Sequence, residues 1–533
     1  MRGRRNPGSR TARSSGMSRP RPDATFPIHP ILATAYPVVF LFAANVADQV
    51  TLDPLWLPLV LAVAGAALVF GIAWLLLRDP WRAGLLSSLL VTLFFWFGHA
   101  WNLLGPFLGS QVWLGILWAI VAVLGTVVAV RAGSWRRGAS TFLNVFLLLL
   151  LGFNAVQIAT YSLAGDVAAV SGPSGSPRMA QPGVAPQRDI YYIVFDRYAS
   201  RPVLADAYGF DNSPFLEGLR DRGFYVADGS RSNYPKTPLS LVSSLNMDFL
   251  DEAALKREAA SGADAGVIHR QLRGPLTVPS ELKRLGYRHV HIANWWEPGA
   301  TNATADTVLR YDGASEFSSA VMRMSLAGAI GAGVGEGPYD RAVLRQHTLY
   351  EFRVLERLAD DPGPKFVYAH FLAPHPPYVF HFDGSFVEQE PLATEDERAG
   401  YIRQMQYVNR RILELVDRLL DAPADEQPVI ILQADEGPFP ARYDANEWRF
   451  DWHTATDEEL GEKAGILNAY HLPGVDPETA GLYPTITPVN SFRVVFNTYF
   501  GTDLPLLPDR VFAHTSQQEF YDFFEVTDRV ASR

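Results

Sequence analysis

The spacing of apolar residues divides the chain into two parts. In the first part, five apolar stretches follow one another at 31–49, 55–77, 83–104, 111–130 and 140–163. Each has about the 20 residues that an α-helix needs to cross a hydrocarbon core of about 30 Å. A cleaved signal peptide would account for one such stretch but not for four more. The pattern therefore predicts five transmembrane helices.

From Asp189 onward, short apolar runs alternate with charged segments of helical period. The runs are DIYYIVF (189–195), FYVAD (224–228), HVHIAN (289–294), KFVYAHF (365–371), PVIILQA (428–434) and GILNAYHL (465–472). Strands that are apolar throughout and alternate with helices indicate a mostly parallel sheet covered on both faces. We therefore expect residues 189–533 to form one α/β domain, an α/β/α sandwich.

Charge also separates the two parts. Residues 1–188 carry 14 Lys and Arg against 5 Asp and Glu, so the net charge of −10 combines +9 here with −19 in the remainder. Arginines gather in the first 25 residues and in the links after the second and fourth stretches, while the other two links have neither Lys nor Arg. The positive-inside rule then places the N-terminus in the cytoplasm and the acidic part outside the plasma membrane. That strongly negative part argues against a nucleic-acid partner.

These patterns predict four segments. Residues 1–28 are expected to be a disordered basic cytoplasmic tail and residues 29–164 the five transmembrane helices. Residues 165–188, rich in Gly, Pro, Ser and Ala, are a predicted linker to the extracytoplasmic domain 189–533. Inside that domain, the apolar segment 318–335 could touch the membrane or cover an active site, but a buried segment or mobile insertion is the favoured interpretation.

The absence of cysteine excludes several kinds of chemistry. A chain of 533 residues with no cysteine has no disulfides, no cysteine zinc site, no thiol nucleophile and no formylglycine made from cysteine. The outer domain must therefore be stable through its α/β core alone. Its nucleophile, if it has one, is expected to be a hydroxyl.

Polar side chains follow several of the predicted strands. Ligands of parallel sheets bind beyond the carboxyl ends of the strands. One acid after a strand is often only a helix cap, but polar side chains after several successive strands favour a site. The residues concerned are Asp196, Asn294, Trp295, Trp296, His370, His375, Asp435 and Glu436.

Thr237 has the sequence setting of a helix start. Pro238 suits the first helical position, and the preceding hydroxyl has the pattern of an N-cap. The simplest interpretation is that Thr237 only caps this helix. The same place, however, puts the hydroxyl where backbone N–H groups and the helix dipole stabilise an alkoxide or a phosphate. A cation bound beside it would make it a nucleophile, and Lys236 would help to hold an anion.

Four features, taken in order, resemble the alkaline-phosphatase/sulfatase superfamily. They are the strand ending in Asp196, Thr237 at a helix start, the His-Pro-Pro-Tyr segment from His375 and the Asp-x-Gly strand end at Asp435. The chain looks most like the membrane-anchored branch, the lipoteichoic acid synthases and phosphoethanolamine transferases, which also place five spans before an extracellular catalytic domain. The resemblance implies an alkaline-phosphatase-like fold, with Asp196 and Asp435 as metal ligands and Thr237 as the phosphorylated nucleophile.

The same resemblance implies substrate-binding residues. His375 looks like the substrate histidine, which would orient or protonate a substrate oxygen, and His370 is the weaker candidate for that role. A looser match is to a headgroup-contacting segment of the synthases, which here falls on Asn294, Trp295 and Trp296.

Glu436 departs from the family pattern, because histidine normally stands at its position. Glutamate can still bind a metal, and a site of Asp196, Thr237, Asp435 and Glu436 would be all oxygen. Such a site favours one divalent ion of Mg²⁺ or Mn²⁺ over Zn²⁺. Alternatively, the exchange marks a weakened or lost metal site.

The function implied is a metal-dependent phosphoryl-group transferase of the phosphoethanolamine or glycerophosphate type. Its partners would be a membrane phospholipid as donor and a cell-envelope acceptor. One alternative is a hydrolase of phosphate or sulfate esters with the same site, because the sequence does not separate water from an alcohol as acceptor. The other, motivated by Glu436, is a catalytically inactive membrane-anchored binding or scaffold protein.

Overall fold

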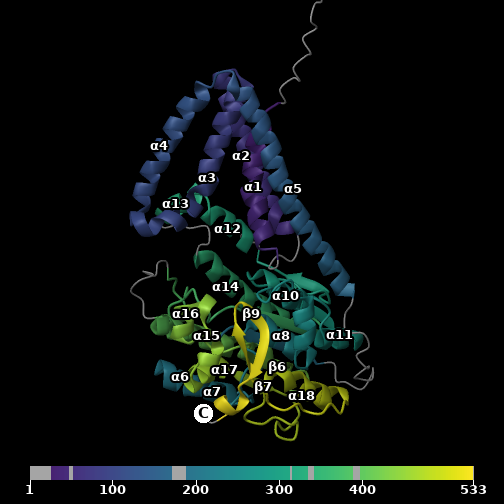
Figure 1. Cartoon of the computed structure of the whole chain (residues 1–533). Coiled ribbons are helices and arrows are strands. Elements are labelled where there is room, and N and C mark those ends of the chain that lie inside the picture. The colour runs from purple at the N-terminus through teal and green to yellow at the C-terminus, as the bar shows by residue number, and fades with distance from the viewer. Residues whose placement is uncertain are drawn as a thin grey trace, which may run out of the picture.

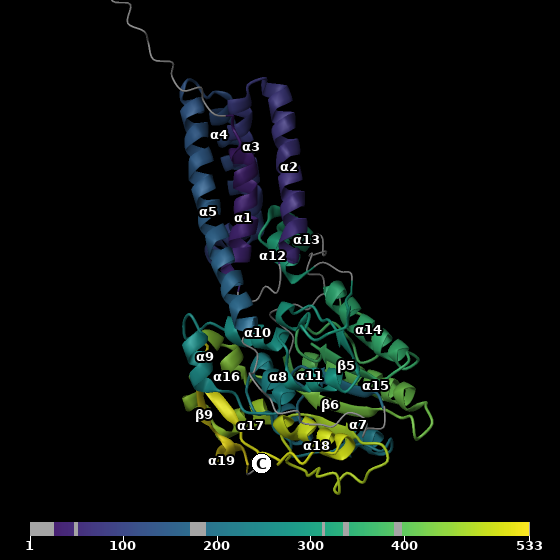
Figure 2. The same ribbon diagram turned by 90° about the vertical axis from the view of Figure 1, so that its right-hand side faces the viewer.

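The computed structural model describes residues 26–46, 52–170, 188–311, 315–333, 341–387 and 397–531. Within them, a bundle of long helices stands on an α/β domain (Figure 1, Figure 2). Most of the predicted tail, 1–28, and residues 171–187 of the predicted linker, 165–188, lie outside the described residues. The start of that linker is helical, because the fifth helix continues to Val170.

Five helices form the bundle, and four of them are long and apolar enough to cross a membrane. The first has 16 residues, which is about 24 Å of helix and shorter than the predicted stretch 31–49. The four later spans are thus confirmed by length and composition, whereas the first, which corresponds to this 16-residue helix, stays a prediction. The helices are α1 (His29–Ala44), α2 (Asp53–Leu77), α3 (Pro80–Leu108), α4 (Gln111–Val130) and α5 (Trp135–Val170).

α1 lies along α5 in the same direction. Near the start of both helices, the backbone N–H of His29 donates to the Asn144 side chain at 2.8 Å, and Asn144 donates to the Phe26 carbonyl at 2.9 Å. Near the end of α1, the Gln157 side chain donates to the Ala43 carbonyl at 3.3 Å. Polar side chains inside the bundle thus join neighbouring helices.

A seven-stranded sheet in the order β2-β7-β6-β1-β5-β3-β4 organises the α/β domain. Neighbours from β6 to β4 pair in parallel, whereas β7 is antiparallel to β6 and β2 is antiparallel to β7. The sheet is mostly parallel, as predicted, with an antiparallel edge. Its strands are β1 (Ile190–Phe195), β2 (Tyr225–Val226), β3 (Arg288–Ile292), β4 (Thr307–Leu309), β5 (Lys365–Phe371), β6 (Val429–Ala434) and β7 (Asn468–His471).

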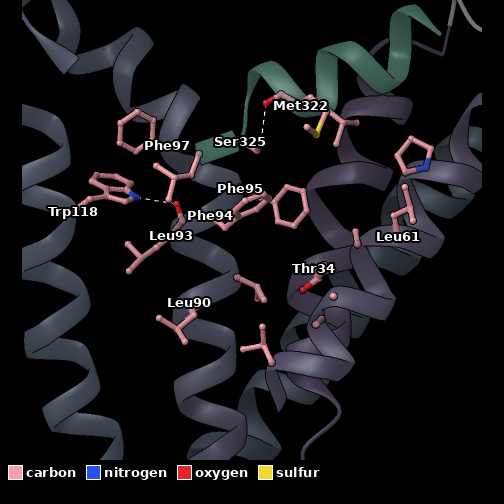
Figure 3. A pocket seen from close by; sticks show the side chains of 18 of the residues that line it. Thr34, Leu61, Leu90, Leu93, Phe94, Phe95, Phe97, Trp118, Met322 and Ser325 are labelled. Carbon is pink, nitrogen blue, oxygen red and sulfur yellow. Dashed lines mark hydrogen bonds between the residues drawn. The ribbon is translucent and has the colours of Figure 1, made fainter. Parts of the chain in front are cut away.

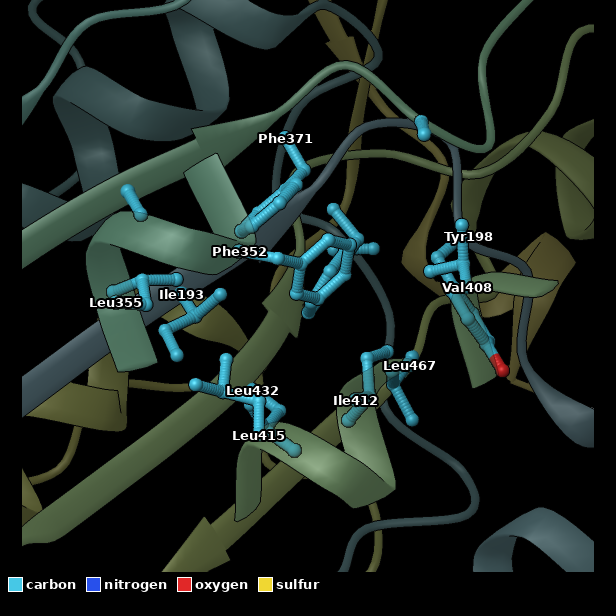
Figure 4. Close-up of a cluster of buried hydrophobic side chains, with 14 of the residues drawn as sticks. Ile193, Tyr198, Phe352, Leu355, Phe371, Val408, Ile412, Leu415, Leu432 and Leu467 are labelled. Atoms are coloured by element: carbon cyan, nitrogen blue, oxygen red, sulfur yellow. The ribbon is translucent and has the colours of Figure 1, made fainter. Parts of the chain in front are cut away.

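Helices cover both faces of the sheet. In β1, Ile193 and Phe195 enter one hydrophobic core and Tyr192 and Val194 enter the other, as the alternation of a strand requires. α7, α14 and α15 close the first core (Figure 4), and α8, α10, α11 and α18 close the second. The helices are α6 (Arg201–Tyr208), α7 (Ser213–Arg220), α8 (Thr237–Asn246), α9 (Glu252–Glu258), α10 (Gly266–Arg273), α11 (Thr277–Arg284), α14 (Arg341–Leu358), α15 (Glu397–Leu420), α16 (Ala441–Asp444), α17 (Asp457–Ala464), α18 (Pro488–Phe500) and α19 (Thr527–Val530). A separate hairpin of β8 (Phe512–Ser516) and β9 (Glu519–Glu525) ends the domain.

Two further helices, α12 (Glu316–Arg323) and α13 (Leu326–Gly333), lie against the membrane helices, although their sequence belongs to the outer domain (Figure 1). Phe317 packs edge-on against Phe42 of α1, with ring centroids 5.3 Å apart. The backbone N–H of Gly98 in α3 donates to the Met324 carbonyl at 3.0 Å. The described part of 318–335 therefore packs on the bundle, where Ser319, Val321 and Ser325 are buried.

Candidate active site

Three strands bring together side chains that are far apart in the sequence. Asp196 follows β1 and Asp435 follows β6, while His370 is the second-last residue of β5. Because β1 lies between β5 and β6, their carboxyl ends meet at one edge of the sheet. One possible ligand atom from each of the three residues lies within 4.8 Å of the others. His370 Nε2 and Asp435 Oδ2 are 3.8 Å apart.

The three residues present buried polar atoms toward one another. Among the described residues, Asp196 Oδ1, His370 Nε2 and Asp435 Oδ2 have no hydrogen-bond partner. Leaving a buried polar atom unpaired costs about 1–3 kcal/mol. Three such atoms in one place fit a bound cation, since two carboxylate oxygens and an imidazole nitrogen are common metal ligands.

The electrostatics of this cluster agree with that fit. Burial raises the pKa of Asp196, and the neighbouring Asp435 raises it further. Burial also raises the pKa of Asp435 and lowers the pKa of His370 to about 3. Two buried carboxylates that repel each other, beside a neutral imidazole, need a positive charge between them to be ionised together.

Asn294 holds the His370 ring in place. Its side-chain amide nitrogen lies 3.1 Å from His370 Nδ1 and donates to the His370 carbonyl at 3.0 Å. The amide is itself fixed, because its oxygen accepts from the backbone N–H of Trp296 at 3.1 Å. Asn294 thus contacts a candidate metal ligand from its outer side, where such contacts orient the ring.

Thr237 does not cap its helix. It is the first residue of α8, the N-cap position is Lys236, and no side-chain cap bond is made there. The capping interpretation is therefore wrong. The Thr237 hydroxyl instead lies near enough to Asp435 to lower the pKa of that carboxyl. The hydroxyl thus lies at the positive end of a helix and against one of the clustered carboxylates.

Three cations gather around one aromatic ring beside this cluster. Arg197, Lys236 and Lys463 lie 4.3, 4.4 and 3.3 Å from the centre of the Phe439 ring. Burial lowers the pKa of Lys236, and it lowers that of Lys463 to about 8. Arg197 has a backbone φ of 59°, and its N–H donates to Asp435 Oδ1 at 3.2 Å. Such left-handed backbone conformations are often found at functional sites.

Glu436 is paired with these cations. Lys463 Nζ lies 2.8 Å from Glu436 Oε1, and Arg197 Nε lies 3.7 Å from the same oxygen. Glu436 is not among the residues whose ligand atoms converge. The cluster is thus made of oxygen and nitrogen donors, with His370 present and Glu436 turned to Lys463.

Of the three remaining predicted residues, Trp296 lies beside the His370 ring, whereas His375 and Trp295 lie in other surroundings. The Trp296 ring lies 6.3 Å from the His370 ring. His375 is farther along the chain from β5, and its pKa is lowered by burial and then by the charge of Arg197. Trp295 packs against the core on the opposite face of the sheet from Trp296.

Sequence reasoning did not select Arg197, Lys463 or Phe439. Arg197 directly follows Asp196 at a strand end, so the same edge argument could have found it. Lys463 lies in the helical stretch DEELGEKA, whose composition is that of a solvent-exposed helix, and nothing in it signals a buried ammonium group.

A family model described as "Sulfatase" matches residues 188–459. The chain belongs to the sulfatase family. The resemblance to this superfamily is thereby confirmed, and the matched region contains every residue of the predicted site. No curated protein matches the chain.

Solved structures of similar fold include membrane-associated enzymes. The periplasmic domain of EptC from Escherichia coli is 14% identical, with 67% of this chain and 100% of that chain covered and a TM-score of 0.42. The lipoteichoic acid synthase LtaP from Listeria monocytogenes is 13% identical, with 68% and 86% covered and a TM-score of 0.40. The lipooligosaccharide phosphoethanolamine transferase EptA from Neisseria meningitidis is 14% identical, with 88% and 95% covered and a TM-score of 0.39.

Proposed function

We propose that this sulfatase-family protein is a membrane-anchored transferase that moves a phosphoryl headgroup from a phospholipid to a cell-envelope acceptor through Thr237. One observation carries the proposal. Three buried ligand atoms without partners, on Asp196, His370 and Asp435, converge beside a threonine hydroxyl at a helix start. This arrangement suits a covalent phosphothreonine intermediate of the phosphoethanolamine or glycerophosphate type.

One divalent metal would be held by Asp196, His370 and Asp435, with Thr237 as a further ligand. The predicted preference for Mg²⁺ or Mn²⁺ over Zn²⁺ depends on an all-oxygen set that includes Glu436. With His370 in the set, Mn²⁺ and Zn²⁺ both suit the donors. When bound, the metal would lower the pKa of the Thr237 hydroxyl and offset negative charge on the phosphoryl oxygens.

The protein's own groups divide the remaining tasks. The nearby Asp435 carboxylate would orient the Thr237 hydroxyl, and the N-terminal N–H groups of α8 favour an anion beside it. Arg197, Lys236 and Lys463 form a cationic group where phosphate oxygens would bind. Trp296, packed next to His370, would contact the headgroup.

The reaction would proceed in two steps. Thr237 Oγ loses its proton and forms a bond to phosphorus while the bond from phosphorus to the diacylglycerol oxygen breaks, and that oxygen takes up a proton. An acceptor hydroxyl then loses its proton and attacks the same phosphorus, the phosphorus–Thr237 bond breaks, and Thr237 Oγ takes up a proton. His375 would orient or protonate a substrate oxygen.

Contacts across the two parts of the molecule support a lipid donor. Arg270 in α10 donates to the hydroxyl of Tyr161 in α5 at 2.7 Å. The next residue, His269, packs edge-on against Trp296 at 5.7 Å between ring centroids. A short chain of contacts therefore links a membrane helix to the neighbourhood of His370, within reach of a lipid headgroup.

The test is Thr237→Ala in the full-length protein, offered vesicles of phosphatidylethanolamine and phosphatidylglycerol labelled in the headgroup. We expect turnover and the covalent label to disappear. Thr277→Ala is the matched control, because Thr277 is also the first residue of a helix and should change neither. Peptide mass spectrometry of the wild type should find the added phosphoryl group on Thr237. Turnover that survives Thr237→Ala would remove the nucleophile assignment.

Product analysis separates the transferase from the hydrolase with the same site. A transferase yields modified acceptor, whereas a hydrolase yields free headgroup phosphate whether or not an acceptor is present. An inactive scaffold would not retain a divalent metal on purification. Its function would also be unchanged by Asp435→Asn. Metal content of the purified chain therefore decides between enzyme and scaffold.

A further inference from the structure

A large apolar cavity lies within the membrane bundle. Its volume is about 740 Å³, inside the range of about 300–1,000 Å³ typical of small-molecule sites. α2, α3 and α4 supply most of its wall, and the remainder comes from Thr34 of α1, from α12, and from Ser325 and Leu326 at the start of α13. In Figure 3, Leu61, Phe94 and Trp118 from three membrane helices surround the space, with Met322 and Ser325 above them.

The wall of the cavity consists mostly of apolar side chains and has few groups that could form hydrogen bonds with a ligand. Its few polar side chains are already bonded within the protein. Thr34 donates to the Pro30 carbonyl at 2.8 Å, Trp118 Nε1 to the Leu93 carbonyl at 2.8 Å, and Ser325 to the Met322 carbonyl at 2.7 Å. The fourth, Ser318, accepts from the Ser315 hydroxyl at 3.0 Å. A polar ligand would therefore lose its own hydrogen bonds on entering, whereas a hydrocarbon chain would lose none.

The cavity lies at the middle of the bundle and in the half nearer the α/β domain. α2 begins, α3 ends and α4 begins on that side (Figure 2). The lining residues run from Leu57 to Val69 in α2, from Leu90 to Phe97 in α3 and from Gly115 to Ala122 in α4. The cavity thus extends from the membrane leaflet that faces the α/β domain to about the middle of the bundle.

The end of the cavity toward that domain is closed by an element of the domain itself. α12 packs on α1 through Phe317 and Val321, and its next turn meets α3 at Gly98. A β-carbon added at Gly98 would lie 2.7 Å from the Met324 Cα. This close approach holds α12 over the space between the membrane helices.

We propose that the cavity binds one acyl chain of a phospholipid from the leaflet that faces the α/β domain. The depth, the hydrocarbon wall and the closure by α12 together fit a lipid whose chain lies between α2, α3 and α4. Its headgroup would pass beside α12 toward the α/β domain. This binding is independent of the transfer reaction proposed above.

The experiment uses the full-length protein in nanodiscs of phosphatidylethanolamine and phosphatidylglycerol. A trace of phosphatidylglycerol carries a photoreactive diazirine in the middle of one acyl chain, and peptide mapping after irradiation locates the label. We expect label on α12 and on the facing residues of α2 to α4. Gly115→Leu, which fills open space in the cavity, should reduce label on α12 several-fold.

Gly71→Leu is the matched control. Gly71 also lies in a membrane helix with open space beside it, but it does not line the cavity, so labelling should stay at the wild-type level. Equal labelling of α12 in the two variants, or no label on α12 in the wild type, would overturn the proposal. A parallel experiment with a diazirine-bearing free fatty acid shows whether the bound acyl chain belongs to a phospholipid or to a free fatty acid. Labelling by the fatty acid alone would also overturn it.

Discussion

Glu436 has a physical role in the structure that its sequence position did not suggest. Its side chain is 3% exposed. A lone carboxylate there would be costly, but Lys463, equally buried, lies 2.8 Å away. The two residues form a buried ion pair beside the site, with the cation supplied by α17.

This pairing predicts a strong coupling between Glu436 and Lys463. Removing one partner of a buried ion pair typically costs about 3–5 kcal/mol, because the other charge is left unpaired. Glu436→Gln and Lys463→Met should each lower the thermal unfolding temperature markedly. The double variant should lose less than the two single effects added together.

Arg510 and Glu525 provide the control pair for this double-mutant comparison. Their side chains are exposed and lie 2.6 Å apart, and exposed pairs contribute only about 0–1 kcal/mol. Arg510→Met and Glu525→Gln should therefore shift the unfolding temperature little. Additive effects at Glu436 and Lys463 would contradict the coupling.

Glu462, next to Lys463, predicts a pH dependence of stability. Burial raises its pKa from 4.5 to about 7, and the Tyr208 hydroxyl donates to it at 3.1 Å. The folded chain therefore holds this proton more tightly than the unfolded chain. The resulting stabilisation is full below pH 4.5 and is lost as the pH rises through 7.

Glu462→Gln removes this titration, so it should raise the unfolding temperature relative to the wild type more at pH 8 than at pH 5. Thermal unfolding in detergent at the two pH values measures the difference. Glu478→Gln, at an exposed position, should give the same small shift at both. A shift at Glu462 that does not depend on pH would refute the prediction.

The candidate site could be predicted in part from single residues. Asp196 and Asp435 were recognisable because acids after apolar strands are local in the sequence. His370 was seen only as a weaker substrate residue, because its approach to Asp435 depends on the strand order β6-β1-β5. Lys463 was not predicted, since its burial results from packing of α17 against Phe439, which no local pattern encodes.

At the scale of elements, the turn between α12 and α13 depends on Gly98. A β-carbon there would lie 2.7 Å from the backbone of Met324, so Gly98→Ala forces α3 and the turn apart. Overpacking of this kind typically costs about 1–3 kcal/mol. We expect a lower unfolding temperature and faster proteolysis within α12 and α13. Gly152→Ala, with nothing within 4 Å of the added carbon, is the control and should change neither.

The strands and most helices of the α/β domain could be predicted because their periodicity is local. The predicted strand 365–371 coincides with β5, and the predicted strand 428–434 contains β6. The place of α12 and α13 could not be predicted. Their apolar residues fit a buried segment of the outer domain equally well, and only the three-dimensional structure shows that the covering surface comes from α1, α2 and α3.

At the scale of the whole molecule, charge and fold together predict the topology. The basic links after α2 and α4 lie at the end of the bundle away from the α/β domain (Figure 2), and the positive-inside rule predicts that this end faces the cytoplasm. The position of the N-terminus depends on α1, whose 16 residues are few for a crossing. Five crossings put the N-terminus opposite the α/β domain, and four put both on the same side.

The chain has no cysteine, so a single introduced cysteine reports one position without background. Right-side-out membrane vesicles treated with a membrane-impermeant maleimide should label Glu478→Cys in the α/β domain. Gly133→Cys, in the link after α4, and Ser14→Cys, near the N-terminus, should be labelled only after permeabilisation, because α1 lies along α5 in the same direction and should cross with it. Labelling of Ser14→Cys in intact vesicles, with Gly133→Cys still protected, would mean that α1 does not cross and that the bundle has four spans.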